Sequence, residues 1–337
     1  MKIAIIGAGS VGFTQKLVSD ILTVPEFQDI EIALTDISRD NLTMITQIIS
    51  AIISANKLPA KVTATTDRRT AVTGARYIMS CVRVGGLPAF ATDIDIPLKY
   101  GVDQCVGDTL CIGGIMYGQR NIPVILEICK DIREVAEPNA LFINYANPMA
   151  MNVWAALNHG NVNTVGLCHG VQHGAEQIAE VFGVSEVDYV CAGINHQTWF
   201  TEIKIGDRVI TRDEMVAGFE AHPVFAQQEK LRIDVLKRFG LYSTESNGHL
   251  SEYLAWYRKG DFSKWIDLSH WIHGETGGYL RETQEQRSWF ETDFPEFLKA
   301  AQMPLSDYER TNEHASYILE ARETGRVYRG HFNTRNN

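Results

Sequence analysis

The sequence predicts an α/β protein in which a doubly wound parallel sheet is followed by a mixed, mainly helical C-terminal domain. In the first half of the chain, short apolar runs typical of buried strands alternate with amphipathic helical patterns, which predicts parallel strands joined by right-handed crossovers. A glycine-rich loop joins the first run, Lys2–Ile6, to the helical pattern after it. Beyond Cys191 the alternation ends and the remaining patterns are largely helical. We therefore expect two domains, residues 1–192 and residues 193–337.

The other elements follow from their own patterns. Strand-like apolar runs lie at 30–34, 62–65, 77–82, 140–145 and 164–167. Helical periodicity is found at 38–56, 122–136, 175–182, 231–239, 249–258, 279–290 and 309–322. The two residues Gly206 and Asp207 predict a hairpin over 199–211. Asn147 followed by Pro148 is typical of a helix N-cap and first helical position.

Composition excludes several classes of protein. The net charge of −10 argues against nucleic acid or an anionic membrane as a partner. Six cysteines without a C-x-x-C pair are typical of reduced thiols in a cytoplasmic protein. The N-terminus lacks a secretory pattern, and no stretch approaches the length of a membrane span. We therefore expect a cytoplasmic protein of the size of an enzyme.

A dinucleotide-binding motif opens the chain. Gly7, Gly9 and Gly12 form G-x-G-x-x-G between a strand and a helix, which is the Rossmann-type context for a bound pyrophosphate. Asp36 ends the second strand at the spacing expected for a ribose ligand, and its charge would repel the extra phosphate of NADP. Arg39 nearby keeps NADP open as an alternative. The cofactor-binding residues that we expect are Gly7, Gly9, Ser10, Gly12, Asp36 and Arg83.

Cys168 and His196 form a second candidate site. Cys168 follows a strand-like run and precedes a helical pattern, and the positive field of a helix N-terminus favours a thiolate. Thiolate and imidazole are plausible metal ligands, and two protein ligands alone would suit a catalytic metal with open positions. The alternative is a buried, inert cysteine beside a loop histidine.

Helical spacing would place His249, Tyr253, Trp256 and Tyr257 on one face. One interpretation is a tyrosine hydroxyl directed into a site, with an imidazole one turn away. The other is an amphipathic helix that buries aromatic rings and exposes their polar tips.

Seven motifs share the order and spacing of one enzyme family. They are Gly7 to Ser10, Arg83-Val84-Gly85-Gly86, Asp108-Thr109-Leu110 with Gly113-Gly114, Asn144 to Met149, Cys168-His169, Gly193 to His196, and Thr244-Glu245-Ser246 with His249 and Glu252-Tyr253. In these motifs the chain resembles glycoside hydrolase family 4, with the α-galactosidase (melibiase) branch nearest. The resemblance covers the whole chain and implies a fold like that of lactate and malate dehydrogenases.

The resemblance also implies a mechanism. The family uses tightly held NAD and a divalent metal, usually Mn²⁺, to oxidise the sugar at C3, eliminate across C1–C2, add water and reduce again. It implies Cys168 and His196 as metal ligands, Tyr253 as the base at C2 and His169 as the acid at the glycosidic oxygen. The substrate contacts implied are Asn147, Asp108 and His249. The expected substrate is an α-galactoside, and the expected assembly is a homodimer or homotetramer.

Departures from the family pattern keep some alternatives open. Cys111-Ile112 replace the Gly-Pro of relatives, and His169 replaces the Asp of phosphoglycosidases, which predicts an unphosphorylated sugar. Relatives continue beyond Asn337, so we expect a truncated chain that lacks its last helices and part of its dimer surface. The alternatives are an α-galacturonidase or α-glucuronidase, a 2-hydroxy acid dehydrogenase, and a non-catalytic NAD-binding protein.

Overall fold

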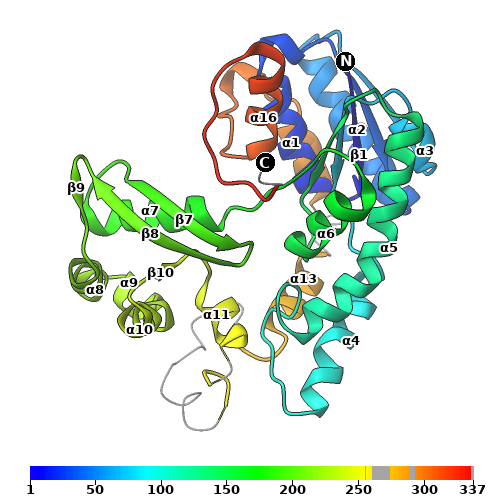
Figure 1. The fold of residues 1–337 in the computed structure, drawn as a ribbon. Coiled ribbons are helices and arrows are strands. Elements are labelled where there is room, and N and C mark those ends of the chain that lie inside the picture. Colours follow the sequence, from blue (N-terminus) through cyan, green and yellow to red (C-terminus); the bar gives the residue numbers. More distant parts are fainter. Residues whose placement is uncertain (255, 260–273, 288–292, 335–337) are drawn as a thin grey trace. The chain divides into compact units, whose positions relative to one another are not determined.

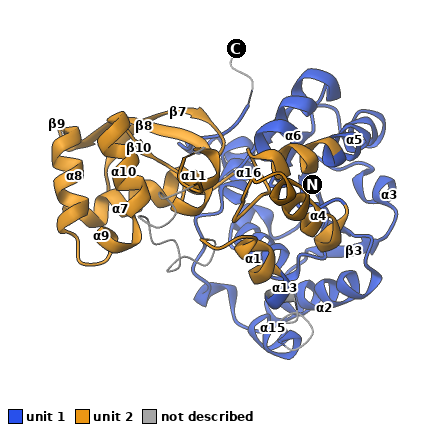
Figure 2. Ribbon diagram, turned by 90° about the horizontal axis from the view of Figure 1, so that it is seen from below, with its two compact units in different colours: residues 1–84, 120–167, 284–337 blue, residues 85–119, 168–283 orange. Residues whose placement is uncertain are grey.

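The computed structural model describes residues 1–254, 256–259, 274–287 and 293–334. It contains two compact units that alternate along the chain (Figure 2). Unit 1 comprises Met1–Val84, Arg120–Leu167 and Gln284–Asn337, and unit 2 comprises Gly85–Gln119 and Cys168–Thr283. Each unit is made of segments that are separated in the sequence. This division therefore does not test the domain boundary predicted at residue 192, which stays a prediction.

Unit 1 contains a six-stranded parallel sheet in the order β3-β2-β1-β4-β5-β6 (Figure 1). Its strands are β1 (Lys2–Ile6), β2 (Glu31–Thr35), β3 (Lys61–Thr65), β4 (Tyr77–Ser80), β5 (Leu141–Asn144) and β6 (Thr164–Gly166). Chain order reverses between β1 and β4, where Ile6 pairs with Thr35 on one side and Ser80 on the other. Ligands bind at the carboxyl ends of the strands at such a switch point. The predicted Rossmann-type sheet is therefore confirmed.

Helices cover both faces of this sheet. Successive side chains of a strand point to opposite faces, and the apolar side chains on each face are buried against helices. Ile3 and Ile5 pack with residues of α1, α2 and α16, whereas Ala4 and Ile6 pack with residues of α3 and α5. The helices that contribute to this unit are α1 (Val11–Leu22), α2 (Arg39–Ala55), α3 (Arg68–Val72), α5 (Ile112–Val135), α6 (Met149–Ala155), α15 (Phe294–Ala300) and α16 (His314–Thr324). Short helical turns occur at η1 (Pro25–Phe27), η2 (Ala156–Gly160) and η3 (Leu305–Asp307).

The start of α6 differs from the prediction. The N-cap position is occupied by Pro148, whose extended dihedral angles (φ −71°, ψ 111°) suit that position, so Asn147 lies one residue outside the helix. The Asn147–Pro148 peptide bond is cis.

Unit 2 is built on an antiparallel sheet in the order β10-β8-β7, with β9 paired to β8. Its strands are β7 (Asp188–Ile194), β8 (Gln197–Ile205), β9 (Arg208–Val209) and β10 (Tyr242–Ser243). Its helices are α4 (Gly86–Lys99), α7 (Gly170–Phe182), α8 (Arg212–Ala221), α9 (Phe225–Gln228), α10 (Lys230–Phe239), α11 (Asn247–Tyr253) and α13 (Gly278–Arg287). Phe200, Phe219 and Tyr242 lie in its core. The predicted hairpin across Gly206-Asp207 is confirmed.

One of the predicted helices ends earlier in the structure. The helix predicted at 249–258 ends at Tyr253, because Leu254 takes extended dihedral angles (φ −104°, ψ 107°). Part of the helix predicted at 279–290 falls at 288–290, outside the described residues. Among the helices that are described, none combines the length and the apolarity needed to cross a bilayer.

Candidate active site

A tight turn positions His196. The β7–β8 hairpin pairs Ile194 with Gln197, so Asn195 and His196 alone form the turn between the strands. His196 lies in the left-handed region (φ +63°), which costs a residue other than glycine roughly 1–2 kcal/mol. Gly193 precedes the turn at φ +139°, and a Cβ there would overlap the carbonyl oxygen of Gln197. Such strain often occurs at functional residues, and here it fixes a buried imidazole at the end of a rigid hairpin.

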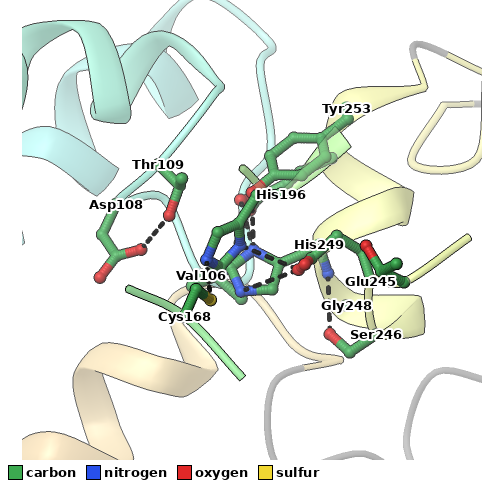
Figure 3. Close-up of polar contacts among 12 residues, drawn as sticks. Val106, Asp108, Thr109, Cys168, His196, Glu245, Ser246, Gly248, His249 and Tyr253 are labelled. Atoms are coloured by element: carbon green, nitrogen blue, oxygen red, sulfur yellow. Dashed lines mark hydrogen bonds and ion pairs between the residues drawn. The ribbon is translucent and has the colours of Figure 1, made fainter. Parts of the chain in front are cut away.

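The His196 ring lies between a thiol and a carboxylate (Figure 3). Its Nε2 is 3.6 Å from Cys168 Sγ, and its Nδ1 is 2.8 Å from Glu245 Oε2. Cys168 follows β6 and immediately precedes the N-terminus of α7, while Glu245 follows β10. Three elements that are distant in sequence therefore bring sulfur, imidazole and carboxylate into one row.

All three groups in this row have shifted pKa values. Burial tends to raise the pKa of the Cys168 thiol, but the neighbouring His196 outweighs it and the pKa falls below its usual value. Burial tends to lower the pKa of His196, but Glu245 and Cys168 raise it well above its usual value. Glu245 is also buried, yet His196, His249 and Arg232 lower its pKa to about 2. The three shifts together favour the charged forms of the thiol, the imidazole and the carboxyl group.

These donors fit a divalent metal ion. A thiolate and an imidazole nitrogen suit a borderline metal, and a carboxylate on the far nitrogen is the usual partner that orients a metal-bound histidine. A second arrangement would use His196, Glu245 and His249, whose ligand atoms lie within 4.8 Å of one another. The close Glu245 contact already engages Nδ1, so the geometry favours Nε2 and Cys168 Sγ as the ligand atoms. Their role as ligands stays a prediction.

His249 connects this row to Tyr253. The Tyr253 hydroxyl lies 2.8 Å from His249 Nδ1, and the two rings stack at 5.6 Å. The His249 ring also meets the His196 ring edge-on at 4.4 Å. Burial, followed by the charges of Glu252 and Glu245, raises the pKa of Tyr253 well above its usual value, so the phenol is protonated. His249 is therefore placed to accept the phenol proton.

Trp256 and Tyr257 do not share this face. The prediction that all four residues align was wrong, because α11 ends at Tyr253 and the chain leaves the helical path. Tyr257 donates to Asp234 at 2.6 Å, and Trp256 stacks on Phe239.

The side chains that contact one another in this site form one cluster, which consists of Cys168, His196, Glu245, His249 and Tyr253. Asp108 and His169 lie beside this cluster. Asp108 is buried, accepts a hydrogen bond from Thr109 at 2.7 Å, and contributes to the raised pKa of Tyr253. His169 occupies the N-cap position of α7 beside Cys168, and its ring stacks on His173. Their predicted roles, substrate contact and acid, stay predictions.

The predicted cofactor residues lie in unit 1. Gly7 has φ +81°, and a Cβ there would lie 2.9 Å from the Cys81 carbonyl carbon. Asp36 Oδ2 accepts from the Gly9 N–H at 2.8 Å, and a Cβ on Gly9 would lie 2.7 Å from that oxygen. Gly12 stands in the first turn of α1, where N–H groups have no intrahelical acceptor and can bind an anion. The loop therefore fits a dinucleotide pyrophosphate.

Three other predicted site residues, Ser10, Arg83 and Asn147, also lie in unit 1. Ser10 occupies the N-cap of α1, but its side chain makes no capping hydrogen bond. Arg83 follows β4 at the carboxyl end of the strand. The Asn147 carbonyl accepts from Asn121 at 3.3 Å.

No role was predicted for Glu245 or Glu252 from the sequence. Both belong to quoted motifs, and their positions four residues before and three residues after His249 were the available signal. The structure places Glu245 within 3.9 Å of His249 Nε2 and Glu252 within 3.9 Å of His249 Nδ1.

We predict that Glu252 makes stability pH-dependent. Burial raises its pKa to about 7, with Asp108 adding to the increase and with backbone N–H groups and Arg258 opposing it. Between its ordinary value of 4.5 and about 7, the unfolded chain releases this proton while the folded chain keeps it, so the free energy of unfolding falls as pH rises. Relative to Glu252→Gln, wild type should lose on the order of 3 kcal/mol across this range in denaturant titrations. Parallel pH profiles for the two proteins would contradict the prediction.

Comparison with known proteins identifies the family. The model for family 4 glycosyl hydrolase matches residues 2–184, and that for the family 4 glycosyl hydrolase C-terminal domain matches residues 191–337. An α-galactosidase of Rhizobium meliloti (strain 1021) is 71% identical over 100% of this chain and 69% of its own length. An α-galactosidase of Bacillus subtilis (strain 168) is 30% identical over 97% of this chain and 74% of its own length.

Solved structures share the fold. A glucosidase structure from Bacillus subtilis superposes with a TM-score of 0.76 at 23% identity, covering 95% of this chain and 76% of that one. A 6-phospho-β-glucosidase from Thermotoga maritima, solved with manganese, NAD⁺ and glucose 6-phosphate, gives a TM-score of 0.72 at 23% identity, covering 96% and 73%. The family models together match nearly the whole chain, which excludes a 2-hydroxy acid dehydrogenase and a non-catalytic NAD-binding protein. The chain belongs to glycosyl hydrolase family 4 and is a glycoside hydrolase.

Proposed function

We propose that this enzyme hydrolyses α-galactosides with NAD⁺ and a divalent metal such as Mn²⁺. The observation that carries the mechanism is the 3.6 Å approach of Cys168 Sγ to His196 Nε2, with Glu245 on the opposite ring nitrogen. Glycosidases that use two carboxylates need neither a thiolate nor an imidazole in this position. The two α-galactosidases to which the chain is similar support the choice of substrate.

Two groups of residues would hold the cofactors. Cys168 Sγ and His196 Nε2 would bind the metal, while Glu245 orients the imidazole. The residues that would bind the dinucleotide are Gly7, Gly9, Ser10, Gly12, Asp36 and Arg83. When bound, the metal supplies Lewis-acid polarisation of sugar oxygens, and NAD⁺ accepts a hydride from C3 and later returns it.

Tyr253 and His249 would move the proton at C2. As the Tyr253 oxygen takes the C2 proton, the phenol proton passes to His249 Nδ1 across the 2.8 Å contact. Glu245 lies 3.9 Å from His249 Nε2 and stabilises the positive charge that forms on this imidazole. The same transfers in reverse return a proton to C2. His169 would protonate the glycosidic oxygen, and Asp108 and Asn147 would contact the sugar.

Two buried arginines of unit 2 are already paired with carboxylates and are therefore not available to bind a uronide carboxylate. Within the described part of unit 2, the arginines with the least exposed side chains are Arg232 (4%) and Arg258 (7%). Arg232 is paired with Glu229 and Arg258 with Asp103, so both charges are already compensated.

The substrate proposal predicts a specific activity profile. With NAD⁺, Mn²⁺ and a reducing thiol, nitrophenyl α-galactoside should be cleaved faster than the α-glucoside, β-glucoside, 6-phosphoglycoside and α-uronide. NADH absorbance should stay flat during turnover, because the hydride that is removed returns to the same sugar. Preferred cleavage of the uronide would contradict the substrate, and NADH accumulating with product would contradict the mechanism.

The proton pathway predicts the behaviour of Tyr253→Phe. Removing the phenol should lower turnover by roughly 10²–10⁴-fold, as is typical when a general base is lost, while NAD⁺ binding is kept. In D₂O, wild type should place deuterium at C2 of the product, and a C2-deuterated substrate should react more slowly.

Tyr257→Phe is the matched control, because it also removes a buried phenol from unit 2, one that bonds to Asp234 outside the cluster. Its turnover should stay close to wild type. If Tyr253→Phe retains near-wild-type turnover and wild type shows no exchange at C2, Tyr253 is not the base.

A further inference from the structure

A tightly wound segment, residues 104–111, leads into α5 and contains Asp108 and Thr109. Gln104 fixes its base, donating to the Asp93 carbonyl at 3.0 Å and accepting from the Gly113 N–H at 2.8 Å. A Cβ on Gly114 would overlap the carbonyl oxygen of Thr109, so the segment packs closely against the start of α5.

The side chain of Glu252, which belongs to α11, forms hydrogen bonds with the backbone of this segment. It is fully buried and accepts from the backbone N–H groups of Val106 at 3.0 Å and Gly107 at 3.1 Å. The Cys111 thiol also donates to it, at 3.6 Å, whereas the Cys105 thiol donates to the Gly248 carbonyl at 3.0 Å and lies 3.7 Å from Glu252. Donors from both sides of Asp108 therefore converge on one carboxylate. Without these bonds, burying a carboxylate would be strongly unfavourable.

We propose that Glu252 is a positioning residue that fixes Asp108 and Thr109 relative to Tyr253 in the substrate site. Glu252 directly precedes Tyr253 on α11, and the N–H groups that it binds directly precede Asp108. The hydrogen bonds therefore link the segment expected to contact the sugar to the helix expected to take its proton. The assignment rests on the function proposed above, in which Asp108 contacts the sugar and Tyr253 is the base.

Fixing the segment would affect the rate because proton transfer depends on the geometry between substrate and base. A displacement of about 1 Å between substrate and base can lower a rate by about 100-fold. Hydrogen bonds of Gln104 and Cys105 anchor the base of the segment, and Asp108 lies at its tip. The two backbone hydrogen bonds to Glu252 act next to that tip.

Two variants of Glu252 separate the hydrogen bonds from the charge. Glu252→Gln keeps one acceptor, because its amide oxygen can replace Oε2, which accepts from both Val106 N and Gly107 N. Its NH₂ group replaces Oε1, the second acceptor for Gly107 N. Glu252→Ala removes the acceptor altogether. Asp234→Ala is the matched control, because Asp234 is another buried carboxylate of unit 2 and bonds to Arg238 and Tyr257 instead of the segment.

The test combines hydrogen exchange of the 106 and 107 amides with steady-state kinetics on nitrophenyl α-galactoside. Glu252→Ala should lose about tenfold or more in protection of these amides, lower turnover and raise KM, each by about tenfold or more, with NAD⁺ affinity unchanged. Glu252→Gln, which keeps one acceptor, should lose less than Glu252→Ala in each of these measurements. Asp234→Ala should unfold at lower denaturant concentration but keep wild-type KM and protection.

Either of two results would overturn the assignment. Wild-type amide protection in Glu252→Ala would show that the hydrogen bonds do not hold the segment. Lost protection with wild-type KM and turnover would show that the link serves stability alone. If wild type does not cleave α-galactosides, the proposed function fails, and exchange in the same variants still shows whether Glu252 holds the segment.

Discussion

The contact of His196 with Cys168 on one side and Glu245 on the other is the constraint on which the site depends. It requires a hairpin turn that holds His196 in the left-handed region and a carboxylate brought close to the start of α7. Gly170 permits that approach, because a Cβ there would lie 2.9 Å from Glu245 Oε1. The missing side chain at Gly170 and the turn at His196 therefore allow the three charged groups to lie next to one another.

The pKa values of two acids of this cluster, Cys168 and Tyr253, shift in opposite directions. Burial tends to raise the pKa of both Cys168 and Tyr253, but His196 reverses the effect at Cys168, whereas Glu252 and Glu245 reinforce it at Tyr253. The result is a thiol that ionises more readily than usual, in the same cluster as a neutral phenol. Groups whose pKa values are driven apart by their surroundings commonly divide the work of a site, and here a thiolate suits a metal and a phenol suits proton transfer.

Local patterns predicted much of the fold. The six parallel strands follow from apolar runs and glycine turns, because these signals depend on neighbouring residues. The end of α11 at Tyr253 and the cap of α6 were not predicted, because dihedral angles at element ends depend on packing. The pairing of Cys168 with His196 was predicted from residue chemistry and a family resemblance. The contacts of Glu245 and Glu252 were not, because they join elements that only the folded chain brings together.

The central claim is that Cys168 and His196 bind a divalent metal, and titration of the metal-free protein with Mn²⁺ tests it most directly. Calorimetry should show binding with release of the His196 proton, and Cys168→Ser should weaken affinity at least about tenfold, because a hydroxyl does not ionise near neutral pH. Cys191→Ser, which changes a free thiol on β7, should bind as wild type does. Equal affinity in wild type and Cys168→Ser would contradict the account.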